Sequence, residues 1–428
     1  MKKYNFIFID LLILFSVLIL SIHFFNQTPI RIFTISYILS SAVFILISFF
    51  VLKYNLNKNI IIISVLIGII IRISFINTMP IGSDDIYRYM WDGKVQSNGI
   101  NPYKFSPADS NLIFLHSDIL PAKVNFPELK TIYFPLSQWL FFLGYQLSGE
   151  NIWGYKLILM IFELLTIIIL HLILRKLNMP SNYLLLYVLC PLPIFQFALD
   201  SHLDGYGLLL ITMSILFYLM RRLAISMIFL GLSLSIKPIG ILFIPVFFLE
   251  EHKISDKLKI LFLPFVTFFI QFIPYIFSSN PFEALFVYAK HWSFNGGIFT
   301  LLNSFIKHNQ ITRIVCGIVL LIVLIPLYLS KYDLLKKIYY SVLMLLIFSP
   351  VVHPWYIGWL TVLMPVVPAY SGIMYSSLSS LTSFTVLSYQ LNSVWKEYPL
   401  VLLLEYIPVI LLMLFELNII KKFYIARN

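Results

Sequence analysis

The residues best suited to chemistry gather in one early segment, 82–107, which reads GSDDIYRYMWDGKVQSNGINPYKFSP. A serine followed by Asp84 and Asp85 is typical of a helix start, because serine caps free N–H groups and acids favour the positive end of the helix dipole. Arg88 and Asp92 follow at spacings of three and four residues, which places these side chains on one helical face. A carboxylate there could accept a proton from an attacking hydroxyl, and the arginine could bind a phosphate. The alternative is a solvated, ion-paired surface helix, because such pairs are common and weak.

A second polar group lies in the turn 199–207, LDSHLDGYG, between two apolar runs. His202 and Asp204 are two residues apart and could form hydrogen bonds with a polyhydroxyl substrate. They could also belong to a metal site, but one turn without a further ligand is weak support for that interpretation. A third interpretation is a plain capping turn, since aspartate and glycine suit a connection between helices.

The third candidate is Lys237, which lies in the apolar context SLSIKPIG. A lysine at membrane depth needs an anionic partner, because an uncompensated charge is costly in hydrocarbon. A phosphate meets that need. The alternative is a salt bridge to an acid within a span, such as Glu163.

The composition determines which elements must position these residues. Of the 428 residues, 60% are apolar and only 11% are charged, and the mean hydropathy is +0.91. A soluble globular chain is excluded, since about a quarter of its residues would be charged. The net charge of +11 is better explained by cytoplasmic loops near anionic lipid than by nucleic-acid binding. Cys190 and Cys316 both lie in apolar runs, which argues against a disulfide framework.

Apolar runs of about twenty residues must be helices, because unpaired backbone groups are not tolerated in the bilayer. We therefore predict an all-α, polytopic transmembrane protein of about 12–14 helices, forming a single membrane-embedded domain over residues 1–428. The predicted spans lie at roughly 6–25, 33–52, 60–77, 152–174, 183–199, 206–220, 260–277, 312–330, 338–352, 356–370, 372–390 and 399–418, with a longer run at 223–249.

Basic residues orient these spans, since short loops rich in lysine and arginine face the cytoplasm. Placing every basic cluster on one side puts both termini in the cytoplasm and makes 78–150 one large extracytoplasmic loop. Residues 133–147 then form an interfacial helix. Residues 223–249 must enter the membrane and return, with the break at Lys237-Pro238, where proline disrupts the helix. The alternative is a single kinked span, which would invert everything downstream.

Several short motifs, in order along residues 80–365, resemble those of multi-span glycosyltransferases of the C-type fold. The closest resemblance is to bacterial polyprenyl-phosphate-mannose-dependent mannosyltransferases, and a more distant one is to the eukaryotic mannosyltransferase of glycosylphosphatidylinositol assembly. The motifs are Asp84-Asp85-Ile86-Tyr87-Arg88-Tyr89 with Trp91-Asp92-Gly93, Asn101-Pro102-Tyr103, Tyr133-Phe134-Pro135-Leu136, His202-Leu203-Asp204, Ile236-Lys237-Pro238 and His353-Pro354-Trp355-Tyr356.

The resemblance implies an inverting transfer of a hexose, with mannose favoured, from a polyprenyl-phosphate donor to a glycan or lipid-linked acceptor on the extracytoplasmic face. It favours Asp85 as the catalytic base, with Asp84 as its rival. The donor phosphate would be bound by Arg88, Lys237 and Lys94. The candidates for substrate contact are Asp92, Tyr133, His202, Asp204, Trp292, His353 and Trp355. No cofactor is required for this chemistry, and a divalent metal is permitted but not indicated.

Two other classes of function compete with this interpretation. A transporter or flippase of lipid-linked sugars would also contain a broken helix and a buried charge, but the acids here gather at one face rather than midway. A polysaccharide polymerase or ligase would be expected to place its large functional loop late in the chain, whereas this loop comes early. His353 and its aromatic neighbours also suit a plain interfacial anchor.

Overall fold

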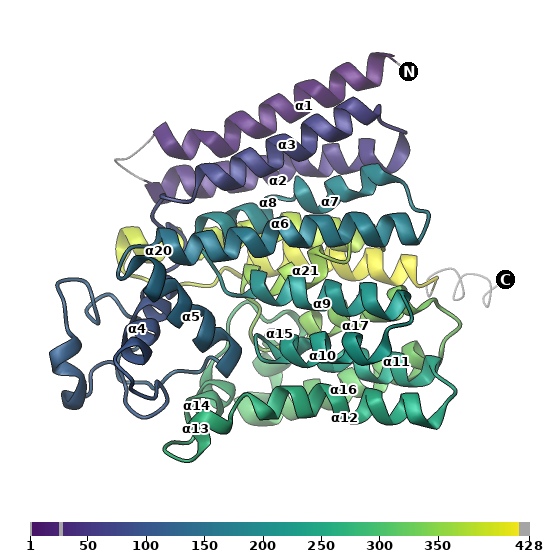
Figure 1. The fold of residues 1–428 in the computed structure, drawn as a ribbon. Helices are drawn as coiled ribbons and strands as arrows, with labels where there is room; N and C mark the ends of the chain where they lie inside the picture. Colours follow the sequence, from purple (N-terminus) through teal and green to yellow (C-terminus); the bar gives the residue numbers. More distant parts are fainter. Residues whose placement is uncertain (1, 25–28, 419–428) are drawn as a thin grey trace. The chain divides into compact units, whose positions relative to one another are not determined.

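The described part of the chain, residues 2–24 and 29–418 of a computed structural model, is helical over most of its length (Figure 1). Within these ranges the structure contains no β-strand, and an isolated bridge pairs Phe294 with Val351. The prediction of an all-α protein is therefore confirmed. The basic pair Lys421 and Lys422, which contributed to the predicted orientation of the C-terminus, lies outside the described residues.

Five helical stretches among the described residues are long and apolar enough to cross a membrane, as expected of a multi-pass membrane protein. They are Tyr4–Phe24, formed by α1 (Lys2–Leu20) and η1 (Ser21–Phe24), and α2 (Pro29–Lys53), α6 (Trp153–Lys176), α16 (Asn309–Leu329) and α21 (Pro399–Glu416). A sixth would be the bent pair Ser181–Val188 and Pro191–Leu199, whose two halves meet at 46°.

The other predicted spans are shorter or interrupted helices. Three of them are α3 (Lys58–Ser74), α9 (Asp204–Leu219) and α17 (Leu334–Phe348). The remaining predicted spans are interrupted: α12 (Ile254–Ile270) with α13 (Ile273–Ile276), α18 (Pro354–Thr361), and α19 (Tyr370–Leu378) with α20 (Ser383–Asn392). Between them lie α14 (Glu283–His291) and α15 (Gly297–Ile306).

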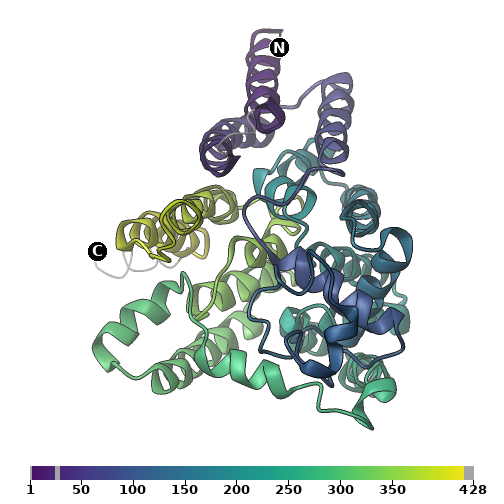
Figure 2. The same cartoon turned by 90° about the vertical axis from the view of Figure 1, so that its left-hand side faces the viewer.

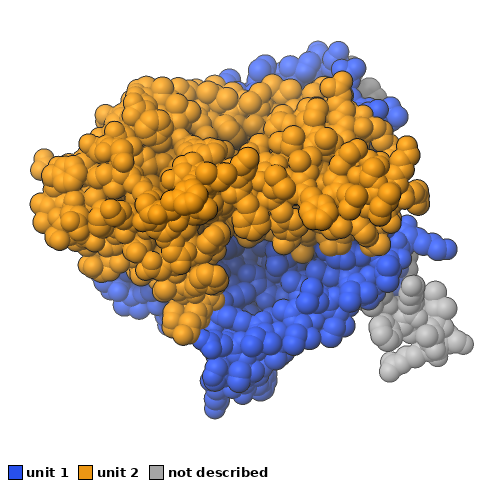
Figure 3. All heavy atoms as spheres, turned by 60° about the horizontal axis from the view of Figure 1, so that its bottom comes forward, with its two compact units in different colours: residues 1–71, 174–195, 293–428 blue, residues 72–173, 196–292 orange. Residues whose placement is uncertain are grey.

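The chain forms two compact units, each assembled from separate stretches of sequence (Figure 3). Unit 1 contains residues 1–71, 174–195 and 293–428, and unit 2 contains residues 72–173 and 196–292. In unit 1, α2 packs against α1 and α19, and Tyr37 of α2 stacks on Phe195 with ring centroids 4.4 Å apart. The early acidic segment, the histidine turn and Lys237 all belong to unit 2.

In unit 2, the helices α6, α9, α10 (Leu223–Leu234) and α12 lie side by side, and the loop helices lie at one end of them (Figures 1 and 2). The predicted loop 78–150 contains α4 (Asp85–Ser97), η2 (Ser110–Leu115) and α5 (Pro135–Ser148). With 14 residues, α5 is too short to cross a hydrocarbon core of about 30 Å. Its length therefore supports the predicted interfacial helix.

The apolar run 223–249 turns back at Lys237, as predicted. It consists of α10, a short 3-10 helix η5 (Pro238–Leu242) and α11 (Phe243–Glu250). Lys237 forms an ion pair with Asp204 at the start of α9, whereas Tyr218 near the end of α9 donates a hydrogen bond to Glu251, just after α11. The run therefore returns to the end of unit 2 from which it departed, and the alternative of a single kinked span is wrong.

The first turn of α5 supplies partners for the backbone and side chain at this break. The Leu136 N–H donates to Ser235 Oγ at 3.1 Å, and Ser137 Oγ donates to the Ser235 carbonyl at 3.4 Å. A helix end inside an apolar environment needs such partners, because its last carbonyls have none within the helix. The loop helix α5 therefore stabilises the turn that carries Lys237.

Two glycines in and after α4 have different tasks. Gly99 has φ +74°, a left-handed conformation that suits glycine at a helix end, so it is the glycine that ends α4. Gly93 lies inside the helix, where an added Cβ would come within 2.4 Å of the Phe141 carbonyl oxygen on α5. The structure assigns Gly93 to the close contact between α4 and α5.

Replacing Gly93 by alanine is expected to destabilise the protein by about 1–3 kcal/mol, because the new methyl group meets backbone that cannot rotate away. Thermal unfolding in detergent would measure the change as a lower Tm. Gly317→Ala is the matched control, since a Cβ at that helical glycine would meet nothing within 4 Å. Equal Tm values for the two variants would contradict the predicted contact.

Candidate functional site

The carboxylate of Asp85 lies at the first position of α4 and faces the histidine turn. The Ser83 Oγ accepts a hydrogen bond from the Asp85 N–H at 3.3 Å, in keeping with the predicted helix start, although Asp84 occupies the N-cap position. Asp85 Oδ2 lies 3.4 Å from His202 Nδ1. The structure therefore brings together two candidates that lie far apart in the sequence.

The backbone around His202 has an uncommon conformation. A π-helical segment, η4 (Ile194–Leu199), precedes the turn, and such segments are frequent at functional sites. Ser201 has φ +65°, a left-handed value that few residues other than glycine adopt, and the His202 N–H donates to the Gln196 carbonyl at 3.0 Å. This turn directs the His202 ring toward α4. It is therefore more than a simple capping turn.

Asp204 starts α9, where the helix dipole favours a negative charge. Its Oδ1 atom lies 2.6 Å from the Nζ atom of Lys237. The acid considered above as an alternative partner of Lys237, Glu163, instead pairs with Arg72, with 3.2 Å between Oε2 and Nε. Lys237 therefore forms a salt bridge, as the alternative interpretation expected, but its partner is Asp204 and not Glu163.

The two pairs share one pattern of exposure. His202 and Asp204 are 1% and 2% exposed at their side chains, whereas Asp85 and Lys237 are 27% and 20% exposed. In each pair, a buried side chain contacts a partly exposed one: His202 contacts the acid Asp85, and Asp204 contacts the cation Lys237. An acid that can accept a proton and a cation that can bind an anion are thus both partly exposed. We call these four residues the acid–cation cluster.

Asp84, the rival of Asp85, is exposed and has different surroundings. Partial desolvation and the charge of Asp85 raise its pKa, and Lys123 opposes this shift. The neighbouring acid therefore makes the ionised form of Asp84 less favourable. The contact with His202 belongs to Asp85, which supports Asp85 as the better placed base.

Tyr89 is a member of this region that motif spacing alone did not single out. Its ring is buried, stacks on Phe141 with centroids 4.4 Å apart and meets Tyr133 edge-on at 5.3 Å. Burial, together with the neighbouring Tyr133, Asp85 and Asp204, raises the pKa of the Tyr89 phenol well above its ordinary value. The phenol therefore stays protonated and can donate a hydrogen bond. Its position four residues after Asp85 on α4 was the available signal.

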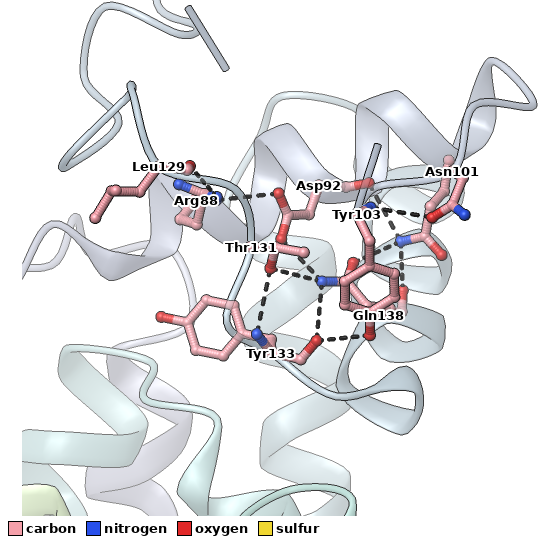
Figure 4. Close-up of polar contacts among 9 residues, drawn as sticks. Arg88, Asp92, Asn101, Tyr103, Leu129, Thr131, Tyr133 and Gln138 are labelled. Atoms are coloured by element: carbon pink, nitrogen blue, oxygen red, sulfur yellow. Dashed lines mark hydrogen bonds and ion pairs between the residues drawn. The ribbon is translucent and has the colours of Figure 1, made fainter. Parts of the chain in front are cut away.

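Arg88 and Asp92 are buried and belong to a network of polar contacts between α4, α5 and the segment that joins them (Figure 4). Arg88 Nε lies 3.1 Å from Asp92 Oδ1, and Arg88 Nη2 donates to the Leu129 carbonyl at 2.8 Å. Gln138 Nε2 donates to Asp92 Oδ2 at 2.9 Å and to Thr131 Oγ1 at the same distance. These bonds tie α4 to α5 and to the segment between them. Arg88 and Asp92 therefore have a structural role in the loop. Their predicted contacts with substrate remain predictions.

Tyr133 follows this segment and is partly exposed. Its carbonyl accepts a hydrogen bond from the Tyr103 hydroxyl at 2.7 Å, so the motif Asn101-Pro102-Tyr103 braces the entry to α5. Asn101 Nδ2 in turn donates to Ser278 Oγ at 2.7 Å and Ser279 Oγ at 2.9 Å, after α13. The motif Asn101-Pro102-Tyr103 therefore connects the loop both to the segment before α5 and to the segment after α13.

Lys94 lies nine residues after Asp85, which places it on the opposite side of α4. Its Nζ atom is 2.6 Å from Glu150 Oε1, beyond the end of α5. Burial alone would raise the pKa of Glu150, but the hydrogen bonds from Lys94 and Ser117 and the charge of Lys94 lower it overall. The structure therefore holds Lys94 away from the acid–cation cluster, and its contact with phosphate stays a prediction.

The Lys94–Glu150 pair should stabilise the fold in a pH-dependent way. Because the pKa of Glu150 is lowered in the folded state, the stabilisation is present above the unfolded pKa and is lost as the pH falls through the folded one. Glu150→Gln is expected to cost up to about 1 kcal/mol at pH 7, since the pair is partly exposed. Thermal unfolding of both proteins should show the gap closing below about pH 4. A constant gap across this range would contradict the assignment.

The aromatic candidates divide between the two units. In unit 2, Trp292 meets Phe126 edge-on, with centroids 4.8 Å apart. In unit 1, His353 lies between two rings, stacked on Trp355 at 4.3 Å and on Phe294 at 4.6 Å. This stack supports the interpretation of His353 and Trp355 as an aromatic anchor, and their predicted contact with substrate remains a prediction.

Within residues 2–24 and 29–418, no three or more His, Cys, Asp or Glu side chains lie close enough together to hold a metal ion. His202 and Asp204, which could have belonged to such a site, instead face Asp85 and Lys237.

No curated protein matches the chain. The crystal structure of ArnT from Cupriavidus metallidurans bound to undecaprenyl phosphate is similar at 14% sequence identity and a TM-score of 0.47, over 78% of this chain and 64% of that one. The chain thus spans less than two thirds of the length of that relative. A family model described as the N-terminal domain of alpha-(1->6)-mannopyranosyltransferase matches residues 18–250, more than half of the chain, and includes all four residues of the acid–cation cluster. This match confirms the resemblance to mannosyltransferases, and the chain belongs to the alpha-(1->6)-mannopyranosyltransferase family.

Proposed function

We propose that the protein transfers a hexose, mannose in keeping with its family, from a polyprenyl-phosphate donor to a hydroxyl of a glycan or lipid-linked acceptor, with inversion at the anomeric carbon. The observation that carries this proposal is the acid–cation cluster. Asp85 and Lys237 are accessible, and each is held by a buried partner, His202 and Asp204. An acceptor-activating base and an anion-binding group are the two functions that such a transfer requires of the protein.

In this mechanism the acceptor oxygen attacks the anomeric carbon while Asp85 takes the hydroxyl proton. The bond between the anomeric carbon and the phosphate oxygen breaks, and its electron pair leaves with the polyprenyl phosphate. The Lys237 ammonium group stabilises the added negative charge on that phosphate. His202 orients the Asp85 carboxylate, and Asp204 holds Lys237 until the phosphate arrives. Asp85, rather than Asp84, is proposed as the base because it contacts the histidine.

We also propose that the cluster faces the extracytoplasmic side and that both termini are cytoplasmic. Asp204 is the first residue of the 16-residue helix α9, and the basic pair Arg221 and Arg222 follows its last residue. The acidic and the basic side chains therefore lie at opposite ends of this helix. Basic turns of this kind face the cytoplasm. Membrane-impermeant labelling of single cysteines at Ser83 and Arg222 would test the orientation. Labelling of both from the same side would rule it out.

Transfer can be tested with the purified protein in lipid nanodiscs. The donor would be a synthetic polyprenyl-phosphate mannose of defined anomeric configuration, offered with a mannose oligosaccharide acceptor. We expect a new glycosidic bond of the opposite configuration, identified by NMR of the product. Because Lys237 supplies the positive charge in this proposal, we expect transfer to continue in EDTA. Use of a nucleotide sugar in place of the lipid donor would contradict the proposal, and movement of the donor across a vesicle membrane without any transfer would favour the flippase.

A further inference from the structure

Lys156 has surroundings that a surface lysine does not have. It lies in the first turn of α6, is 3% exposed, and its ammonium group faces four backbone carbonyls. Two of them belong to the connection between α3 and α4, namely Phe75 at 3.0 Å and Thr78 at 2.5 Å. The other two end the π-helical segment, namely Ala198 at 3.3 Å and Leu199 at 2.6 Å. One buried cation therefore joins two stretches of chain.

Asp200 joins the same two stretches a few residues further along. It is 1% exposed, and its Oδ1 atom accepts hydrogen bonds from the N–H groups of Ile81 at 2.8 Å and Gly82 at 2.9 Å. These bonds join the same two stretches of chain as the Lys156 contacts, but here the side chain accepts hydrogen bonds from backbone N–H groups instead of donating them to carbonyls. A carboxylate receives N–H groups, and an ammonium group donates to carbonyls.

The two fixed stretches are those that carry the proposed base and its histidine. Asp85 comes three residues after Gly82, and His202 comes two residues after Asp200. On α6, Glu163 lies about two helical turns after Lys156 and pairs with Arg72 near the end of α3, so the connection is tied to α6 at two points. The 3.4 Å contact between Asp85 and His202 joins the segments that follow these two stretches.

We propose that Lys156 and Asp200 are positioning residues for the proposed transfer: together they hold the backbone before α4 against the histidine turn, so that Asp85 and His202 meet in the orientation needed for proton abstraction. This inference rests on the proposed function and assigns the two residues no contact with substrate. Burying a lysine is costly, and here its four carbonyl contacts offset that cost only while both stretches of backbone stay in place. A shift of about 1 Å in a reacting group can slow an enzyme by about a hundredfold.

The test compares variants that remove these bonds with variants that retain them. Lys156→Met and Asp200→Ala remove the bonds. Lys156→Arg keeps a donor cation, and Asp200→Asn keeps an oxygen that can accept from both N–H groups. Lys130→Met is the control, because Lys130 forms an exposed pair with Glu283 elsewhere in unit 2. Each protein, as the full chain in nanodiscs, is assayed for kcat and for KM of a synthetic polyprenyl-phosphate mannose. Hydrogen–deuterium exchange is measured in parallel over residues 76–90.

We expect Lys156→Met and Asp200→Ala to lower kcat by about a hundredfold with KM changed less than about threefold, and to speed exchange over residues 76–90. Lys156→Arg and Asp200→Asn should recover most of kcat. The proposal is overturned if exchange is unchanged, if kcat falls only in proportion to the folded fraction, or if exchange rises while kcat is retained. Should Lys156→Met fail to fold, the Asp200 pair decides the matter. Absence of transfer by the unaltered chain would refute the proposed function, whereas the exchange measurement would still test the bonds.

Discussion

Asp85→Asn is expected to lower kcat by about a thousandfold, while the protein folds and binds its lipid donor as before. The expectation follows from the loss of the proton acceptor, since general base catalysis contributes about 10²–10⁴-fold. The amide is similar in size to the carboxylate and remains next to His202, so the turn should keep its shape. Single-turnover transfer from the polyprenyl-phosphate donor would measure the chemical step, and a separate equilibrium assay would measure donor binding.

Asp84→Asn is the matched control for this experiment, because the two acids are adjacent in the sequence. We expect its kcat to fall less than about tenfold, since Asp84 is exposed and the contact with His202 belongs to Asp85. Full activity in Asp85→Asn would remove that residue as the base. If Asp85→Asn keeps full activity while Asp84→Asn loses it, Asp84 is the base.

Lys237→Met is expected to weaken donor binding by about a hundredfold, equivalent to about 2.8 kcal/mol. The variant removes the accessible cation but keeps a flexible, apolar side chain of similar length. It also leaves the buried Asp204 without the 2.6 Å contact to Lys237, which should cost up to about 3 kcal/mol of stability. Titration with donor and thermal unfolding would separate the two effects.

The double variant Lys237→Met with Asp204→Asn distinguishes a binding site from a structural salt bridge. Removing both charges should restore most of the lost stability, because no uncompensated carboxylate remains. Donor binding should stay weak, since the cation is still missing. Recovery of binding along with stability would show that Lys237 acts only on the fold.

The basic clusters predicted that the run 223–249 turns back, because charge placement in a membrane follows a simple physical rule. Placing Arg221 and its counterparts on one side required the run 223–249 to return, and the structure places the break at Lys237. The same rule, applied to the sequence alone, brings Asp85, His202 and Lys237 to one face. The placement of basic clusters on one side of the membrane can therefore be used to predict where a chain turns back, from a single sequence.

The partners within the site could not be predicted in the same way. Spacing on α4 indicated the Arg88–Asp92 pair, since residues four apart on a helix are neighbours. Contacts between distant segments leave no such period, so the bonds from Lys94 to Glu150 and from Lys156 to backbone carbonyls gave no signal. Carbonyl partners are the least visible of all, because every residue has one.

The bonds between α5 and Ser235 also have a consequence for how the protein is made. At the tip of the returning hairpin, the Ser235 carbonyl and hydroxyl accept hydrogen bonds from Ser137 and Leu136, which are translated about a hundred residues earlier. The partners of the hairpin tip are therefore synthesised before the hairpin itself. We therefore expect α5 to be in place before the hairpin packs against it.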